Sequence, residues 1–176
     1  MAVLSSSRRI ATLGLLVAVG VSLFVLEALI PLPVPFLKVG LANISTLLAL
    51  MLFDAPAALL VVGLRVVIGS LLTGSLFSPA FVMAIGGGLA SAAAMGIART
   101  AFRDAFSPIG LSVIGSVTHV VAQLTLVSLF FVHGFALSYL LPLLLGSALA
   151  GGLVVGWLSA RVLRAIEPLG YSVKTE

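Results

Sequence analysis

Long apolar stretches, separated by short segments rich in proline, glycine or charge, dominate the hydrophobic pattern of the chain. About 20 apolar residues at ~1.5 Å per residue cross the hydrocarbon core of a bilayer. The pattern therefore predicts a single all-α integral membrane domain over residues 1–176, built as a six-transmembrane-helix bundle. The predicted spans cover about residues 10–30, 40–53, 57–72, 80–98, 109–132 and 135–160.

The second and third segments are short for membrane helices and allow an alternative, a re-entrant hairpin. The tip of such a hairpin would place Asp54 inside the membrane, which is energetically costly for a carboxylate. Pro56 also suits the first turn of a helix, where its missing N–H breaks no hydrogen bond. Two spans are therefore the preferred interpretation.

The composition agrees with the pattern and excludes an ordinary soluble domain. Hydrophobic residues make up 61% of the chain and charged residues 8%, whereas soluble domains carry roughly 25% charged residues. The chain contains no cysteine, which excludes disulfides, thiolate metal sites and thiol catalysis.

The positions of lysine and arginine predict the orientation. With six spans, one face of the membrane carries seven of the nine basic residues: Arg8, Arg9, Arg99, Arg103, Arg161, Arg164 and Lys174. The positive-inside rule makes this face cytoplasmic, so we expect both termini inside and the chain in the bacterial cytoplasmic (inner) membrane. The net charge of +4 is then a topology signal, and no nucleic-acid partner is expected.

The sequence lacks the patterns that an autonomous enzyme in this setting needs. No phosphate-binding loop of the Gly-x-x-x-x-Gly-Lys-Ser/Thr type occurs. The five acidic residues are scattered, with no two within eight residues, so no carboxylate cluster for magnesium is indicated. His119 and His133 have no carboxylate neighbour that would suggest a metal site. We therefore expect no catalytic residues, no metal and no cofactor.

Arg65, near the middle of the third span, is the sharpest single signal. A guanidinium inside a membrane is costly unless it is paired or hydrated, and it offers a forked donor to carboxylate or phosphate. One interpretation is an anion-binding group that faces a cavity. The alternatives are an internal ion pair with Glu27, or an arginine whose charged head reaches an interface.

Further polar residues are candidates for the same site. Lys38 and Asn43 lie between a proline-rich segment and a helix start, where free N–H groups and the helix dipole favour anions. Lys38 as an interface lysine is the alternative. His119 and Gln123 form an i, i+4 pair on one helix face, which suits either a ligand or a neighbouring helix.

Small residues recur at four-residue steps in three of the spans. Such stripes allow membrane helices to approach closely, and in the fourth and sixth spans they predict packing within the chain. In the first span, Gly14, Ala18 and Ser22 begin near the cytoplasmic side, so docking of a partner subunit is a strong rival to internal packing.

Several strings resemble the Gx transporter family, also labelled heptaprenyl diphosphate synthase component I. They are Lys38-Val-Gly-Leu-Ala-Asn-Ile44, Leu64-Arg65, Gly69-Ser70-Leu71-Leu72, Gly74, Phe77-Ser78-Pro79 and Gly86-Gly87-Gly88. The resemblance covers about residues 8–165. It implies a six-helix membrane protein similar to the substrate-binding S components of energy-coupling-factor transporters.

The sequence departs from the family pattern in two places. The fifth span reads His119-Val-Val-Ala-Gln123, which keeps the His and Gln of the pattern His-Asn-x-Gly-Gln but lacks its Asn and Gly. The Ala-x-x-x-Ala docking pattern of S components is present only as Gly14-Leu-Leu-Val-Ala18.

Two functional hypotheses follow. The first is a small-molecule binding subunit for uptake, in which Lys38, Asn43, Arg65, His119 and Gln123 bind an anionic substrate and an energy-coupling transmembrane subunit with ATPases supplies the energy. The second is a non-catalytic scaffold or accessory subunit of a prenyl-lipid, quinone or electron-transfer complex. An Arg65 locked to Glu27 with no adjoining cavity favours the scaffold, whereas an outward-open cavity lined by Lys38 and Arg65 favours uptake.

Overall fold

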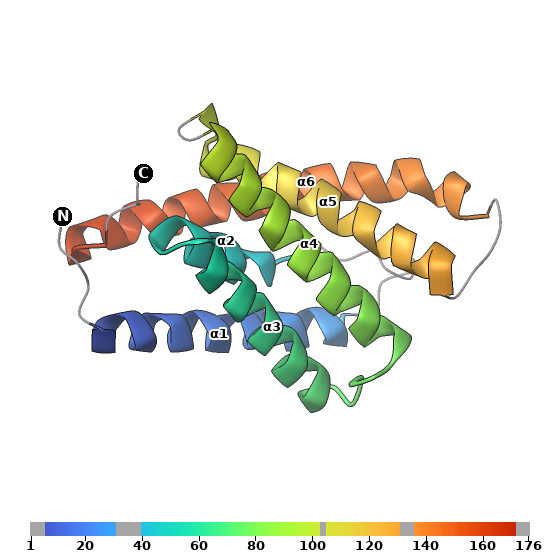
Figure 1. Ribbon diagram of the computed structural model, residues 1–176, viewed down its shortest axis with the longest axis horizontal. Coiled ribbons are helices and arrows are strands. Elements are labelled where there is room, and N and C mark those ends of the chain that lie inside the picture. Colours follow the sequence, from blue (N-terminus) through green and yellow to red (C-terminus); the bar gives the residue numbers. More distant parts are fainter. Residues whose placement is uncertain (1–5, 31–39, 103–104, 131–135, 172–176) are drawn as a thin grey trace.

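The computed structural model describes residues 6–30, 40–102, 105–130 and 136–171, and over these residues its regular secondary structure is helical, with no strand. Six α-helices follow one another, and a short 3₁₀ helix ends the described chain (Figure 1). Their bounds are α1 Ser6–Leu29, α2 Asn43–Leu52, α3 Ala55–Leu72, α4 Pro79–Phe102, α5 Pro108–Phe130, α6 Ala136–Ile166 and η2 Glu167–Leu169.

Five of the described helices are long and apolar enough to cross a bilayer, and α2 is not one of them. Its 10 residues extend about 15 Å, roughly half of a ~30 Å hydrocarbon core. The prediction of a membrane-crossing helix over 40–53 is therefore wrong in length. The helix starts late because a tight turn precedes it: Gly40 has a φ of 78°, and Asn43 N–H donates to Gly40 O at 2.8 Å.

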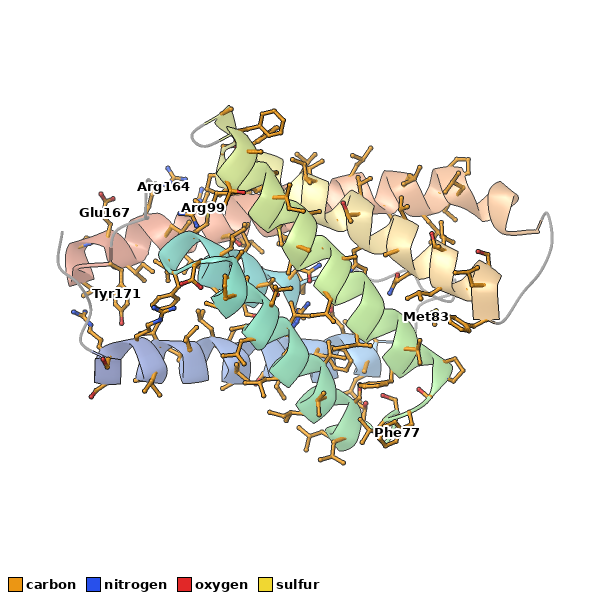
Figure 2. The ribbon with its side chains drawn as sticks, viewed as in Figure 1. Phe77, Met83, Arg99, Arg164, Glu167 and Tyr171 are labelled. Atoms are coloured by element: carbon orange, nitrogen blue, oxygen red, sulfur yellow. The ribbon has the colours of Figure 1, made fainter. Side chains whose placement is uncertain are left out.

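The start of α1, the α2–α3 turn and the end of α6 meet at one end of the bundle (Figure 1). Arg9 Nη2 lies 2.8 Å from Asp54 Oδ2, and Arg8 donates to Leu169 O at 2.8 Å. The first described helix therefore begins, and the last one ends, at the same end of the bundle. Figure 2 shows Tyr171 near the start of α1, where its hydroxyl lies 3.0 Å from Thr12 Oγ1.

The α2–α3 turn lies at this end of the bundle (Figure 1). Asp54 precedes α3, and its Oδ1 accepts a hydrogen bond from Ala57 N–H at 2.8 Å. Pro56 occupies the first turn of α3, as predicted from its missing N–H.

The short helix α2 forms the centre of the bundle and contacts the other five helices. All of its residues from Ser45 to Leu52 are buried. A helix that ends in the hydrocarbon core would leave its terminal N–H and C=O groups without hydrogen-bond partners if those ends faced lipid. Because α2 is surrounded by protein, its ends do not face lipid. Arg99 of α4 donates to Leu50 O and to Met51 O and so caps the carboxyl end of α2.

The small-residue stripes of α4 and α6 pack within the chain, as predicted. A Cβ added to Gly88 would lie 2.8 Å from Val62 Cγ1 of α3. A Cβ added to Gly156 would lie 2.6 Å from the Ile109 backbone of α5. These glycines therefore let neighbouring helices approach at backbone distance.

Candidate anion-binding cavity

A cavity of about 250 Å³ lies where all six helices converge. The residues around it come from α1, the turn before α2, and α2 to α6. They are Phe24, Glu27, Gly40, Ala42, Asn43, Arg65, Val66, Ala80, Met83, Ala84, Ser116, His119, Val120, Gln123 and Ala148. The lining is mostly apolar, with a few convergent polar groups, which is the usual character of a small-molecule site.

Four of the five residues predicted to bind substrate line this one cavity: Asn43, Arg65, His119 and Gln123. They come from three helices, α2, α3 and α5, so only the fold brings them together. The fifth predicted residue, Lys38, lies outside the described residues.

Arg65 is almost fully buried, with 3% of the residue exposed. Its Nη2 donates to Asn43 Oδ1 at 2.6 Å. Within the described part of the chain, Nε and Nη1 have no hydrogen-bond partner. A buried charge with unpaired donors is strongly unfavourable, so Nε and Nη1 are candidate donors to an anionic group.

Asn43 is oriented by this bond. A guanidinium has donors only, so the amide oxygen must face Arg65 and the Nδ2 amide group must point away from it. A Cβ added to Gly40 would lie 3.4 Å from Asn43 Nδ2, which places this donor beside the turn before α2. Asn43 therefore holds Arg65 with its oxygen and keeps a donor for a second partner.

Glu27 lines the cavity but does not lock Arg65, contrary to one of the sequence-based alternatives. The carboxylate is buried, with 9% exposure, and its Oε1 accepts a hydrogen bond from Leu41 N–H at 2.7 Å. Arg65 donates to Asn43 instead, and a cavity adjoins both charged groups. The locked Arg65–Glu27 pair that would favour the scaffold is therefore not found among the described residues, whereas the arrangement that would favour uptake also requires Lys38, which lies outside them.

The amino end of α2 points to the cavity, because Ala42 and Asn43 both line it. The N-cap residue, Ala42, makes no side-chain hydrogen bond that would cap this end. The positive end of the helix dipole therefore acts at the cavity, as in transporter folds whose interrupted helices direct their amino ends at anionic groups. Arg65 and this helix end are both positive, and the Glu27 carboxylate in the same lining is the one anionic side chain described beside them.

His119 and Gln123 form the α5 wall of the cavity and pack on Gly87 of α4. A Cβ added to Gly87 would lie 2.9 Å from Gln123 Cγ and 3.1 Å from His119 Nε2. The glycine therefore sets how deeply both polar side chains sit, a role that the sequence analysis did not assign to it. The string Gly86-Gly87-Gly88 was the available signal.

Two further lining residues, Phe24 and Met83, were not predicted, since apolar side chains in an apolar span carry no distinguishing signal. Glu27 was weighed only as a counter-charge. It is the only acidic residue within the predicted spans, and this isolation is the sequence signal that could have placed it at the site.

The three residues predicted to dock a partner do not take part in the cavity. Gly14, Ala18 and Ser22 are exposed along one face of α1. A Cβ added to Gly14 would meet nothing within 4 Å, so this stripe, unlike those of α4 and α6, is not used for packing among the described residues.

No metal site competes with this interpretation in the part of the chain that the structure describes, where no three His, Cys, Asp or Glu residues group together.

Comparisons with curated proteins and with solved structures give no match. Residues 16–162 match the family described as heptaprenyl diphosphate synthase component I, the Gx transporter family. The matched range includes every described residue that lines the cavity. The resemblance seen in the sequence strings is thus confirmed, and the chain belongs to the heptaprenyl diphosphate synthase component I family.

Proposed function

We propose that this chain is the substrate-binding subunit of a membrane uptake system and that its substrate carries an anionic group. The observation that carries the proposal is Arg65, which is buried beside a cavity with Nε and Nη1 unpartnered among the described residues. A carboxylate or phosphate oxygen supplies the acceptors that these donors lack.

The electrostatics of the site point the same way. Insertion scales put the cost of an arginine at the centre of a membrane helix at about 3 kcal/mol. Placing it against the positive end of α2 adds repulsion. An anion that pairs with Nε and Nη1 of Arg65 and accepts from Nδ2 of Asn43 relieves both effects at once.

The other wall orients the rest of the substrate. His119 and Gln123 offer hydrogen-bonding groups, while Phe24, Val66 and Met83 surround its apolar part. We propose that Lys38 adds a second cation at the outer mouth, as the sequence suggests.

The size of the cavity bears on the substrate. Sites for drug-sized ligands occupy roughly 300–1,000 Å³, and this one has about 250 Å³. It suits a compact molecule, and a long prenyl chain of the kind that the family label names exceeds it. Together with the scattered acidic residues, this supports a binding role rather than catalysis.

Energy for transport comes from a partner, because the sequence carries no phosphate-binding loop. We propose that an energy-coupling transmembrane subunit with ATPases docks on Gly14, Ala18 and Ser22, as in S components of energy-coupling-factor transporters. The exposure of all three residues supports this docking face.

Mass spectrometry of small molecules that co-purify with the protein tests the proposal. We expect an anionic compound with the wild type and its loss from the Arg65→Gln variant. Arg161→Gln is the matched control, because Arg161 lies over the Trp157 ring on the surface of α6 and away from the cavity. If no compound depends on Arg65, and Arg65→Gln leaves uptake in cells unchanged, the proposal is wrong.

A further inference from the structure

The helix α1 carries two opposite faces with different neighbours. Gly14, Ala18 and Ser22 lie on the exposed face, whereas Gly20, Phe24 and Glu27 recur at helical spacing on the inner face. At 3.6 residues per turn, the two sets point to nearly opposite sides of the helix. The face proposed for docking and the face that meets the site therefore belong to one rigid element.

Three residues on successive turns of the inner face of α1 lie next to the anion site. A Cβ added to Gly20 would lie 2.5 Å from Ser45 Oγ and 3.2 Å from Arg65 Cδ, so α1 passes directly beneath the arginine stem. One turn further, Phe24 packs over Gly69 of α3 and lines the cavity. Glu27 completes the series near the outer end of the helix.

Glu27 is bonded to the turn that starts α2. Its carboxylate accepts from Leu41 N–H at 2.7 Å, and Ile44 N–H in turn donates to Leu41 O at 3.0 Å. The next link is Asn43, whose Oδ1 accepts from Arg65 Nη2 at 2.6 Å. Two hydrogen bonds, Leu41 to Glu27 and Arg65 to Asn43, together with the backbone from Leu41 to Asn43, therefore connect α1 to the guanidinium.

The attachment of α1 to the rest of the bundle is restricted. Among the described α-helices, it packs against α2 and α3 and not against α4, α5 or α6. At its other end, Arg8 and Arg9 tie it to Leu169 and Asp54. If the carboxyl-terminal half of α1 moved, it would first break contacts with the turn before α2. His119 and Gln123 of α5 would not be displaced directly.

We propose that Glu27 is a positioning residue through which α1 sets how firmly the anion site holds its ligand; this inference rests on the proposed function. With Leu41 bonded to Glu27, the turn places Asn43 and the amino end of α2 against Arg65. When α1 moves, the Leu41 amide loses its carboxylate acceptor, the turn loosens and the anion is released. A partner that docks on the outer face of α1 gains control of the site by this route.

The test compares Glu27→Gln, which keeps a carbonyl acceptor for Leu41 N–H, with Glu27→Leu, which removes it. Glu167→Gln, in the exposed η2 segment, is the matched control for loss of a carboxylate. Full-length protein in detergent is titrated with sodium benzoate and with inorganic phosphate, and the NMR signal of Arg65 Nε reports binding. The two probes distinguish a carboxylate site from a phosphate site.

We expect Glu27→Leu to weaken binding about tenfold, the effect of one lost hydrogen bond to a charged group. Glu27→Gln should stay within about threefold of the wild type, since a neutral acceptor retains most of that bond. Hydrogen exchange of the Leu41 amide, measured without ligand, should accelerate in Glu27→Leu and change much less in Glu27→Gln.

Three results separate the possibilities. If both variants tighten binding, Glu27 acts only as a repelling charge and the inference is wrong. If neither variant changes binding or exchange, α1 does not hold the turn and the inference is again wrong. If neither probe moves the Arg65 signal in the wild type, the proposed anion site fails, and the exchange of Leu41 decides the positioning role on its own.

Discussion

The two ends of α2 each meet an arginine, and the two arginines have different surroundings. At the carboxyl end, Arg99 donates to the Leu50 and Met51 carbonyl oxygens (Figure 2 shows Arg99 near the α2–α3 turn). At the amino end, Arg65 has one bond to Asn43, while Nε and Nη1 have no partner among the described residues. Arg99 thus pairs carbonyl oxygens at one end of α2, whereas Arg65 at the other end keeps donors without a described partner.

The helix dipole explains why this difference matters. A cation at a helix carboxyl end is favourable, whereas a cation at the amino end is repelled. Arg99 therefore stabilises the fold without any ligand. Arg65 is held in an unfavourable position by the surrounding packing, which is the pattern expected of a residue retained for binding rather than for stability.

The largest expected effect tests this contrast directly at Arg65. Replacing it by methionine removes the only described cation of the cavity, and we expect binding of the anionic ligand to fall by about a hundredfold or more, as for truncation of a buried charge pair. Thermal unfolding of the ligand-free protein should be unchanged or shifted upward, since an incompletely paired charge is removed. A large loss of stability in this variant would contradict the contrast.

Arg99→Met should show the opposite signature. Two buried carbonyl oxygens at the end of α2 lose a charged donor, and we expect a loss of about 2–3 kcal/mol in unfolding free energy. Denaturation in detergent, followed by circular dichroism, measures the change. Ligand affinity per folded molecule should stay near that of the wild type, and a selective loss of affinity would show that Arg99 acts on the site.

Asn43→Asp sharpens the comparison by giving Arg65 a permanent anionic partner. The new carboxylate lies at the position of the amide oxygen, 2.6 Å from Nη2 in the wild type. We expect higher stability and about tenfold weaker binding of the anionic ligand, because the guanidinium is already neutralised. Asn43→Ser, which adds no charge, serves as the control and should not raise the stability.

The smallest effect concerns the turn next to the completed end of α2. Asp54→Ala removes the cap of α3 and the exposed ion pair with Arg9. We expect a loss of about 1 kcal/mol, mostly from the cap, since exposed ion pairs contribute little. Asp54→Asn should recover most of the cap, and an equal loss in both variants would instead assign the effect to the ion pair.

Much of the fold could be predicted because each span carries its own signal. The apolar lengths gave the helices, and the four-residue stripes of α4 and α6 gave their packing. Asp54 and Pro56 fixed the α2–α3 turn. The length of α2 could not be predicted in the same way. Residues 40–42 are as apolar as the helix that follows, and only the turn at Gly40 delays the start of the helix to Asn43.

The candidate site was predicted as a set of residues but not as a geometry. Arg65, Asn43, His119 and Gln123 stood out as polar groups in apolar spans, and they line one cavity. Their partners did not stand out. The bond from Arg65 to Asn43, the bond from Leu41 to Glu27 and the packing of His119 on Gly87 all join residues from different helices, whose relative rotation no single span specifies.

The sequence by itself determined that this chain is a membrane protein, where its helices lie and which polar groups are too costly in hydrocarbon to be incidental. These properties depend on the transfer of each segment from water to lipid, so they can be read segment by segment. The tertiary structure decided that α2 is a buried half-helix, that its amino end meets Arg65, and that α1 reaches the site through Glu27. These features depend on distances between helices, which are set by packing across the whole bundle.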